Sequence, residues 1–395
     1  MSSIDFGLVL NLHQPAGNLE DLLERREWEA KEILWALDRI PRSLWEHEDI
    51  GRVHLSLSGT LLETLADPRF QERAYGIVDC GSLLWHLQNT RTIEVLGTAY
   101  YHPVLPLIPP ADRDEQISRW LGIGRHLFCR DRFPGFWPPE LGFCMDLVPT
   151  LSAHHYEWVI VDSEHVRPLT PMRWEELRYR PHRARVGDAE IVVVVRDRDL
   201  SNAQESGMDA GWFIEEVRAR TQHCNFPPLV TTATDGDNGG WFRNTTRGSN
   251  FWSGFYTELA ERARVGQSGG IRPAFISDYL LRHGAHGWVT VDPGAWNTGD
   301  HHGAGFVQWT GSQAQRDALA RVAYLSNAVR AVPRDALDRE PRAAELIEQA
   351  RWRVLRAQTS CNFYWGEAWV QRCHHDLDAA AAHLDQALNL LRTAK

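Results

Sequence analysis

The sequence predicts an α/β barrel followed by a helical region. Seven short apolar runs recur and lead into polar residues; they are 6–12, 53–57, 93–95, 158–161, 191–195, 229–233 and 288–291. Because these runs are apolar at nearly every position, they are typical of strands buried on both faces of a parallel sheet. Segments with helical spacing lie between them, for example 112–130 and 212–221. This strand, helix, strand order indicates either an α/β barrel or a doubly wound sheet.

The distribution of polar residues favours the barrel. His13 follows the first run, His102 lies a few residues beyond the third, and Asp235 follows the sixth. Polar residues after nearly every strand are typical of a barrel, whereas a doubly wound sheet concentrates them at one switch point. The chain has no G-x-G-x-x-G or Walker sequence, which argues against the usual dinucleotide and triphosphate sites. We therefore predict a catalytic barrel over residues 1–311.

The pattern after residue 312 is helical only. Leu377, Ala381, Leu384 and Leu388 recur at alternating spacings of four and three, and 346–357 has a similar repeat. We expect a C-terminal helical region over residues 312–395 that packs as a bundle against the barrel.

Composition narrows the class of protein. Of the 395 residues, 43% are hydrophobic and 24% are charged, as in a soluble globular protein. A net charge of −10 without clustered Lys and Arg argues against a nucleic-acid partner. The start has no signal-like region and no later stretch is apolar enough to span a membrane, so we expect a cytoplasmic protein with no membrane partner. Six widely spaced cysteines indicate reduced thiols, and oligomeric state is left open.

One acidic residue, Glu140, stands in the unusual segment Phe136-Trp-Pro-Pro-Glu140. The two prolines fix backbone φ angles and remove two N–H donors, so we expect a rigid strand end with an aimed carboxylate. The alternative is an acid at the N-terminus of a helix over 141–151, stabilised by the helix dipole.

A second acidic segment runs Asp235-Gly-Asp-Asn-Gly-Gly-Trp241 and is too rich in glycine to continue a strand or a helix. It suits a tight loop that approaches a ligand, with a calcium-binding turn as the alternative. Either Asp235 or Asp237 could be a general acid, because burial or a neighbouring carboxylate can keep one protonated near neutral pH. Two acids at strand ends beside tryptophans suit hydrolysis or transfer at a glycosidic bond.

Histidines and tryptophans supply further candidates. His13 and His102 suit hydrogen bonds to substrate hydroxyls, while the doublets at 154–155, 301–302 and 374–375 lack the close ligand spacing of a metal site. We predict no metal and no cofactor. Tryptophans in polar loops suit sugar platforms, with core packing as the alternative; they are Trp137, Trp241, Trp252, Trp296, Trp309 and Trp365.

The chain resembles glycoside hydrolase family 57, and five segments in the family's order carry the likeness. They are His13-Gln14-Pro15, EVLGTAYYHPVLPL from Glu94, WPPE ending at Glu140, DGDNGGW from Asp235, and the stretch from Ser277-Asp278-Tyr279-Leu280 to Pro293-Gly294-Ala295-Trp296. The resemblance implies an incomplete (β/α)7 barrel followed by helices, and a retaining enzyme active on α-glucans.

The resemblance also implies roles for single residues. Glu140 would attack the anomeric carbon to form a glycosyl-enzyme, and Asp235 would protonate the leaving oxygen and then activate water or an acceptor sugar. Asp237 stands where the family pattern has Glu. The residues expected to line the sugar subsites are His13, Glu94, His102, Trp137, Asp237, Trp241 and Trp296.

Several functions remain as alternatives. The first is a hydrolase that cleaves malto-oligosaccharides or α-glucans, with a 4-α-glucanotransferase as the alternative within this class. A non-catalytic glucan-binding or regulatory barrel is the second. A deacetylase-like metalloenzyme is the third, but the sequence lacks the Asp-Asp and H-x-x-x-H pairs that it requires.

Overall fold

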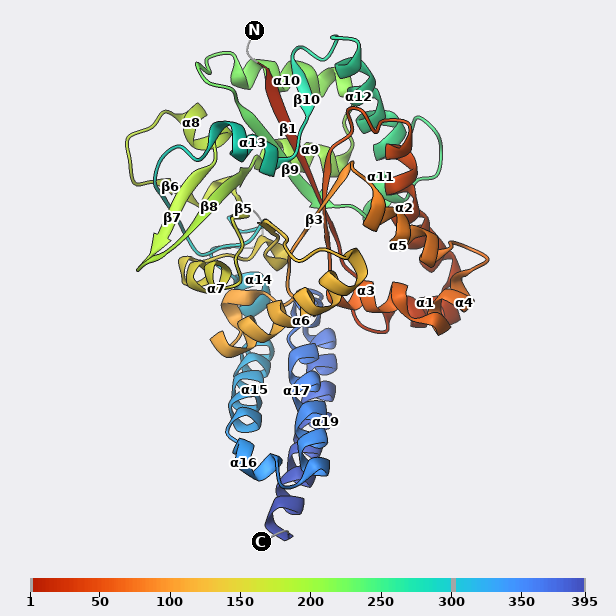
Figure 1. The fold of residues 1–395 in the computed structure, drawn as a ribbon, viewed down its shortest axis with the longest axis vertical. Helices are drawn as coiled ribbons and strands as arrows, with labels where there is room; N and C mark the ends of the chain where they lie inside the picture. Colours follow the sequence, from red (N-terminus) through yellow and green to blue (C-terminus); the bar gives the residue numbers. More distant parts are fainter. Residues whose placement is uncertain (1–2, 300–302, 394–395) are drawn as a thin grey trace.

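The computed structural model describes residues 3–299 and 303–393. Its upper part contains the strands and the helices around them, and its lower part is a stalk of helices that ends at the C-terminus (Figure 1). None of the helices in the described ranges is long and apolar enough to cross a membrane.

Seven parallel strands of the described chain form the barrel. They are β1 (Ile4–Leu12), β2 (Val53–Leu57), β3 (Ile93–Leu96), β4 (Gly135–Phe136), β5 (Trp158–Asp162), β8 (Ala189–Arg196) and β9 (Leu229–Asp235). Strand β1 pairs with β2 and with β9, β2 with β3, β4 with β5, and β5 with β8. A parallel bridge from Gly97 to Phe136 joins β3 to β4, and the Asp197 N–H donates to the Thr231 carbonyl between β8 and β9. The predicted incomplete (β/α)7 barrel is therefore confirmed.

One predicted strand forms, but it lies outside the parallel sheet in which it was expected. The apolar run 288–291 becomes β11 (Val289–Val291), which pairs antiparallel with β6 (Val166–Pro168) outside the barrel. The seventh strand of the barrel is β4 instead. It has two residues and is therefore too short to produce an apolar run in the sequence. A side chain at Gly135 would collide with the Trp158 indole, so the close approach of β4 to β5 requires glycine there. Two further strands extend the sheets at their edges, β7 (His182–Val186) and β10 (Ile271–Pro273).

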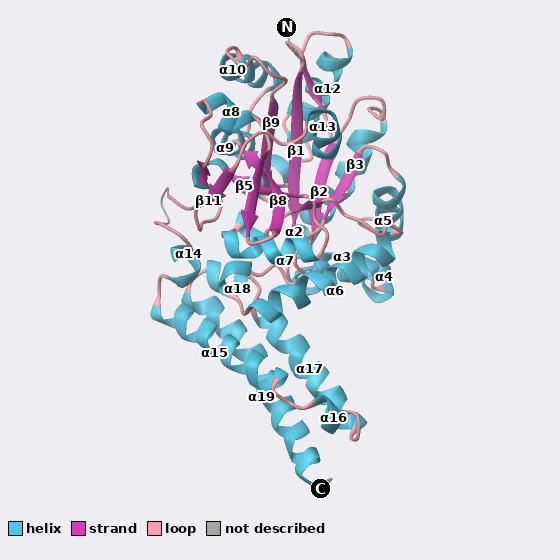
Figure 2. Cartoon of the chain, turned by 60° about the vertical axis from the view of Figure 1, so that its left-hand side comes forward, coloured by secondary structure: helices cyan, strands magenta, loops and turns pink. Residues whose placement is uncertain are grey.

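Helices cover the outside of the barrel (Figure 2). They are α1 (Asn18–Arg25), α2 (Glu27–Trp45), α3 (Gly59–Ala66), α4 (Pro68–Ala74), α5 (Cys80–Asn89), α6 (Pro110–Phe128), α7 (Val148–Ala153), α8 (Trp174–Tyr179), α9 (Arg198–Ser206), α10 (Ala210–Thr221), α11 (Gly239–Arg243), α12 (Thr257–Arg264) and α13 (Ile276–His283). Short 3-10 turns lie at Leu105–Leu107, Pro139–Leu141, Met145–Leu147 and Ser163–His165, and a π-helical turn at Trp252–Tyr256. The predicted helices 112–130 and 212–221 correspond to α6 and α10.

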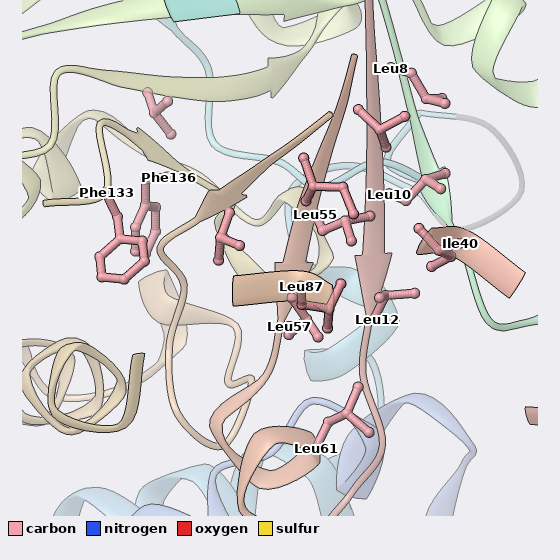
Figure 3. Packing of buried hydrophobic residues seen from close by; sticks show 14 of the residues in the cluster. Leu8, Leu10, Leu12, Ile40, Leu55, Leu57, Leu61, Leu87, Phe133 and Phe136 are labelled. Atoms are coloured by element: carbon pink, nitrogen blue, oxygen red, sulfur yellow. The ribbon is translucent and has the colours of Figure 1, made fainter. Parts of the chain in front are cut away.

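Alternation along the strands separates two apolar cores. Leu8, Leu10 and Leu12 point outward and pack with Ile40 of α2 and Leu87 of α5 (Figure 3). The intervening positions point inward, where Val9 belongs to a second cluster that fills the barrel. Its other members include Leu96, Trp137, Trp158, Ile160, Val194, Ala233 and, from α13, Ile276 and Tyr279. The same period of two places Asn11 and then His13 on the inner side at the carboxyl end of β1.

The C-terminal helices form their own core. They are α14 (Val307–Thr310), α15 (Gln313–Arg330), α16 (Arg334–Leu337), α17 (Pro341–Ala357), α18 (Cys361–Tyr364) and α19 (Glu367–Thr393). Buried residues such as Val322, Ile347, Val354 and Leu377 make this core, which continues to Val104 of the barrel part. The predicted helical repeats thus lie on α17 and α19, while the division of the chain at 311/312 stays a prediction.

Candidate active site

A cavity of about 540 Å³ lies at the carboxyl ends of the barrel strands, between the barrel and the C-terminal helices. Six of the predicted site residues line it: His13, His102, Glu140, Asp235, Asp237 and Trp296. The helical region contributes the wall that faces them, through Cys361, Tyr364, Trp365 and Trp369. Residues more than 200 positions apart in the sequence therefore meet in one cavity.

Glu140 is held in a strained backbone conformation. Its φ of 60° and ψ of 15° lie in the left-handed region, and Leu141 after it also has a positive φ of 50°. Such conformations cost on the order of 1–3 kcal/mol for residues other than glycine and persist where the surroundings fix them. The Trp296 N–H donates to the Glu140 carbonyl at 3.1 Å, and the Leu141 N–H donates to the Pro138 carbonyl at 2.8 Å. The strand end is therefore tightly held, as the two prolines predicted.

The helix alternative for Glu140 was wrong. Helix α7 begins at Val148, eight residues further on, and the turn at Glu140 is a 3-10 turn. Glu140 is 8% exposed, and its carboxyl group instead points at side chains in the cavity wall. Its Oε1 accepts a hydrogen bond from the Ser360 hydroxyl at 2.7 Å and lies 3.6 Å from Nδ1 of His102.

A chain of side-chain contacts joins Glu140 to Asp235. His102 Nε2 lies 3.3 Å from Oδ1 of Asn11, and the Asn11 amide donates to Oδ1 of Asp235 at 3.1 Å. Asn11 and His102 are buried, with 2% and 1% of their surfaces exposed. The two carboxyl groups are therefore close enough for the charge of Asp235 to raise the pKa of Glu140.

Asp237 has a different set of partners. Its Oδ2 accepts from the Gln14 amide at 2.8 Å, and its backbone carbonyl accepts from Arg243 Nε at 2.9 Å. Arg243 belongs to α11, whose N-cap is Asn238. The sequence predicted that a segment this rich in glycine would not continue a strand or a helix. Strand β9 does end at Asp235, and α11 begins only at Gly239. Gly239 has a φ of 74°, a left-handed conformation that glycine adopts without strain.

The electrostatics of the cavity are dominated by burial. Burial raises the pKa of Glu140 to about 7, and the nearby charge of Asp235 acts in the same direction. Burial, with Glu205 adding to it, raises the pKa of Asp235 to about 6. Burial and Asp235 raise the pKa of Asp237 to about 7. The three carboxyl groups therefore titrate near neutral pH, in the range that suits proton transfer to a leaving group.

The two histidines are held neutral. Their rings stack at a centroid separation of 4.1 Å and an interplanar angle of 9°. Burial lowers the pKa of His13 to about 3, and burial followed by the charge of His13 lowers the pKa of His102 well below its usual range. Neutral imidazoles suit hydrogen bonding to substrate hydroxyls or to neighbouring side chains rather than ion pairing.

Of the six predicted tryptophans, Trp296 and Trp365 line the cavity and four do not. Trp252 and Trp309 are fully buried, as core packing requires. Trp137 is fully buried inside the barrel, where it packs edge-on against Trp296 with ring centroids 5.7 Å apart. It therefore supports the wall that Trp296 provides. Trp241, on α11, is half-buried beside Gly207 and Gly254 and lies outside the lining.

Glu94 lies far from these residues along the barrel axis. It is the second residue of β3, so it points inward near the amino ends of the strands, whereas the cavity lies at their carboxyl ends. Its Oε1 accepts from the Ser277 hydroxyl at 3.0 Å and lies 3.7 Å from Nε2 of His54. Residues at this end of a barrel serve stability, and the structure does not bring Glu94 to the candidate site.

Sequence reasoning missed several residues of the cavity. Asn11 could have been found, because it lies two positions before His13 on the same face of β1. Tyr364 and Trp369 of the lining, and Ser360 beside Glu140, had no such signal. Helical periodicity alone does not show which residues of a helical region reach a barrel. Metal ligands are a separate matter: within 3–299 and 303–393, no group of three or more His, Cys, Asp or Glu is arranged to hold a metal ion. The His301-His302 doublet lies outside the described residues.

The comparisons with known proteins agree with this architecture. Residues 16–291 match the family model described as glycosyl hydrolase family 57. An α-amylase of Pyrococcus horikoshii is 30% identical over 201 residues, which are 51% of this chain and 29% of that protein. A 4-α-glucanotransferase of Thermococcus kodakarensis is 28% identical over 166 residues, covering 42% of this chain and 23% of that protein. The matched regions span less than a third of these two relatives.

A solved structure extends the likeness to the whole fold. The crystal structure of a branching enzyme from Thermococcus kodakaraensis superposes with a TM-score of 0.74 and 13% identity, covering 100% of this chain and 92% of that chain. At that identity the likeness concerns the fold. The family match, which covers well over half of the sequence, places the protein among the glycosyl hydrolases. The chain belongs to glycosyl hydrolase family 57.

Proposed function

We propose that this protein is a retaining glycoside hydrolase or transglycosylase that cleaves α-glucosidic bonds of malto-oligosaccharides or α-glucans. One observation carries the proposal: Glu140 and Asp235 line the same cavity and are joined through His102 and Asn11. Retaining enzymes require such a pair of carboxyl groups, one to attack the sugar and one to move the proton.

The roles follow the positions of the two acids in the family's segments. Glu140 is the nucleophile, and its rigid backbone and the hydrogen bond from Ser360 hold one carboxylate oxygen in a fixed direction. Asp235 is the acid/base, because burial raises its pKa and so helps it to hold a proton, give it to the leaving oxygen and then take one from water or an acceptor sugar. Expulsion of water by a bound sugar strengthens both interactions.

The cavity walls suit sugar rings. Trp296 on the barrel side faces a cavity whose helical side carries Tyr364, Trp365 and Trp369. Flat aromatic faces bind the apolar face of a pyranose, while the carboxyl and amide groups between them bind its hydroxyls. The names of the relatives, α-amylase and 4-α-glucanotransferase, support an α-glucan as the substrate.

The proposal includes two general properties. A neutral oligosaccharide, rather than a nucleic acid, suits a chain with a net charge of −10. A cytoplasmic location suits a protein whose six cysteines, Cys129 on the surface included, are free thiols.

Incubation with maltoheptaose and separation of the products tests the proposal. Shorter sugars alone would indicate hydrolysis, and longer sugars as well would indicate a 4-α-glucanotransferase. Glu140→Gln should abolish product formation and keep affinity for maltoheptaose, because the amide preserves the shape but cannot attack. Glu94→Gln is the matched control, since Glu94 is also buried with a pKa near 7 but lies outside the cavity. Full activity in Glu140→Gln would refute the mechanism, and binding without turnover by the wild type would favour the non-catalytic barrel.

A further inference from the structure

Ser360 lies beside Glu140 although 220 residues separate them. It precedes α18 in the C-terminal helical region, and both side chains are buried. We propose that Ser360 is a positioning residue for Glu140: its hydroxyl donates to Oε1 and thereby fixes the direction of the carboxylate and favours its charged form. This inference rests on the proposed function, because it takes Glu140 as the nucleophile.

The protons around Glu140 can be assigned from the hydrogen-bond network. The Asn11 amide nitrogen donates to Oδ1 of Asp235, so Oδ1 of Asn11 faces His102. His102 therefore carries its proton on Nε2, and because the ring is neutral, Nδ1 has none. Nδ1 lies 3.3 Å from the Ser360 oxygen and 3.6 Å from Glu140, but it has no proton to give to either.

The serine proton consequently has two possible acceptors, Glu140 at 2.7 Å and Nδ1 of His102 at 3.3 Å. The shorter contact is to a carboxylate, and hydrogen bonds to charged acceptors are about twice as strong as neutral ones. The hydroxyl therefore donates to Glu140. A donor of this kind stabilises the carboxylate and opposes the rise in pKa that burial causes.

Ser360 is itself held in place from the barrel side. Its backbone N–H donates to the His102 carbonyl at 3.0 Å. The preceding residue, Thr359, forms an antiparallel bridge with Pro103. The loop that carries His102 and the segment that carries Ser360 therefore pair with each other like two short strands.

A single side chain of α6 holds both segments. The Gln116 amide oxygen accepts from the Tyr101 N–H at 2.9 Å, next to His102. Its amide nitrogen donates to the Leu355 carbonyl at 2.9 Å and to the Gln358 side chain at 3.0 Å. Gln358 in turn donates to the buried Asp112 at 2.5 Å. Gln116, with no exposed surface, thus fixes the distance between the two sides of the pair.

The test compares three variants of the full chain with a matched control. Ser360→Ala removes the donor, Ser360→Cys replaces it with a weaker one, and Ser360→Thr keeps it. The control is Thr359→Val, because Thr359 lies in the same segment, valine keeps its size, and the hydroxyl that donates to Glu140 belongs to Ser360. Each variant is first checked for an unchanged melting temperature.

The readout is kcat/KM for maltoheptaose from pH 4.5 to 9. A hydrogen bond to a charged group contributes about 1.5–3 kcal/mol, so Ser360→Ala should lower kcat/KM about 10- to 100-fold at pH 6. The acid limb should move about one to two pH units upward, because Glu140 then ionises at higher pH. Ser360→Cys should show an intermediate shift, and Ser360→Thr and Thr359→Val should behave like the wild type.

Two results for Ser360→Ala would overturn the inference: an unchanged acid limb of the pH profile, or a fall in kcat/KM of equal size at every pH. Either would mean that Ser360 serves packing alone. A failure of the proposed function would look different. Full activity in Glu140→Gln would show that Glu140 is not the nucleophile, whatever the Ser360 variants do.

Discussion

Replacing Glu94 with Gln should make the protein more stable at alkaline pH. Glu94 lies at the amino end of the barrel, 17% exposed as a side chain, between the Ser277 hydroxyl and Nε2 of His54. His54 Nδ1 contacts the Leu8 carbonyl, and its Nε2 accepts from the Ile276 N–H. No proton is left on this face of His54 to balance a charge on Glu94.

The size of the effect follows from the pKa. Burial raises the pKa of Glu94 from 4.5 to about 7, while the Ser277 hydrogen bond opposes the rise. The folded state therefore holds the proton more tightly than the unfolded state, so stability falls as pH rises from about 4.5 and the loss is complete above about 7. A shift of about 2.5 units at 1.36 kcal/mol per unit amounts to about 3 kcal/mol. Glutamine keeps the acceptor for Ser277 and never ionises.

Urea unfolding at pH 5 and at pH 8 measures this difference. We expect Glu94→Gln to unfold like the wild type at pH 5 and to exceed its free energy of unfolding by up to about 3 kcal/mol at pH 8. Maltoheptaose turnover should be unchanged. Glu345→Gln on the exposed surface of α17 is the control, with an effect within about 0.5 kcal/mol at both pH values. A Glu94→Gln variant that is less stable at pH 8, or that loses sugar affinity, would refute the reasoning and return Glu94 to the subsites.

The remaining predictions concern the acids at the other end of the barrel. Asp235→Asn should lower kcat about 10²- to 10⁴-fold and Asp237→Asn less than about tenfold. The reason is that Asp235 contacts Asn11, on the side of the proposed nucleophile Glu140, whereas the carboxyl group of Asp237 is hydrogen-bonded to Gln14. The reverse order in product assays would move the acid to Asp237. Asp162→Asn should cost about 3–5 kcal/mol in urea unfolding, because it leaves the buried Arg196 without its carboxylate at 2.5 Å; a loss below about 1 kcal/mol, as expected for an exposed pair, would contradict this.

The sequence predicted the barrel well because each strand is short, apolar and followed by polar residues. The prediction failed where a strand is very short or where its pairing partner lies outside the barrel. Strand β4 has two residues, so its apolar signal is lost, whereas 289–291 has the same apolar pattern but pairs antiparallel with β6. Pairing partners are set by tertiary contacts that local pattern does not contain.

The site was predicted in part for a similar reason. Glu140, Asp235 and His102 lie at the carboxyl ends of strands, where the order of elements alone places them together. Glu94 belonged to the same resembling segment as His102, but β3 passes between the two ends of the barrel within that segment. Ser360 depends on the way that the C-terminal helices dock, which no sequence pattern indicated.

The proposed attack of Glu140 on the sugar can be tested directly. The most direct measurement uses a fluorinated α-glucosyl fluoride that slows breakdown of a glycosyl-enzyme, followed by acid quenching, proteolysis and mass spectrometry. We predict one added glycosyl group on the peptide that contains Glu140 and no added glycosyl group in Glu140→Gln. The products of the wild type should keep the α configuration. Turnover with no adduct, an adduct on another residue, or products of inverted configuration would contradict the proposed attack.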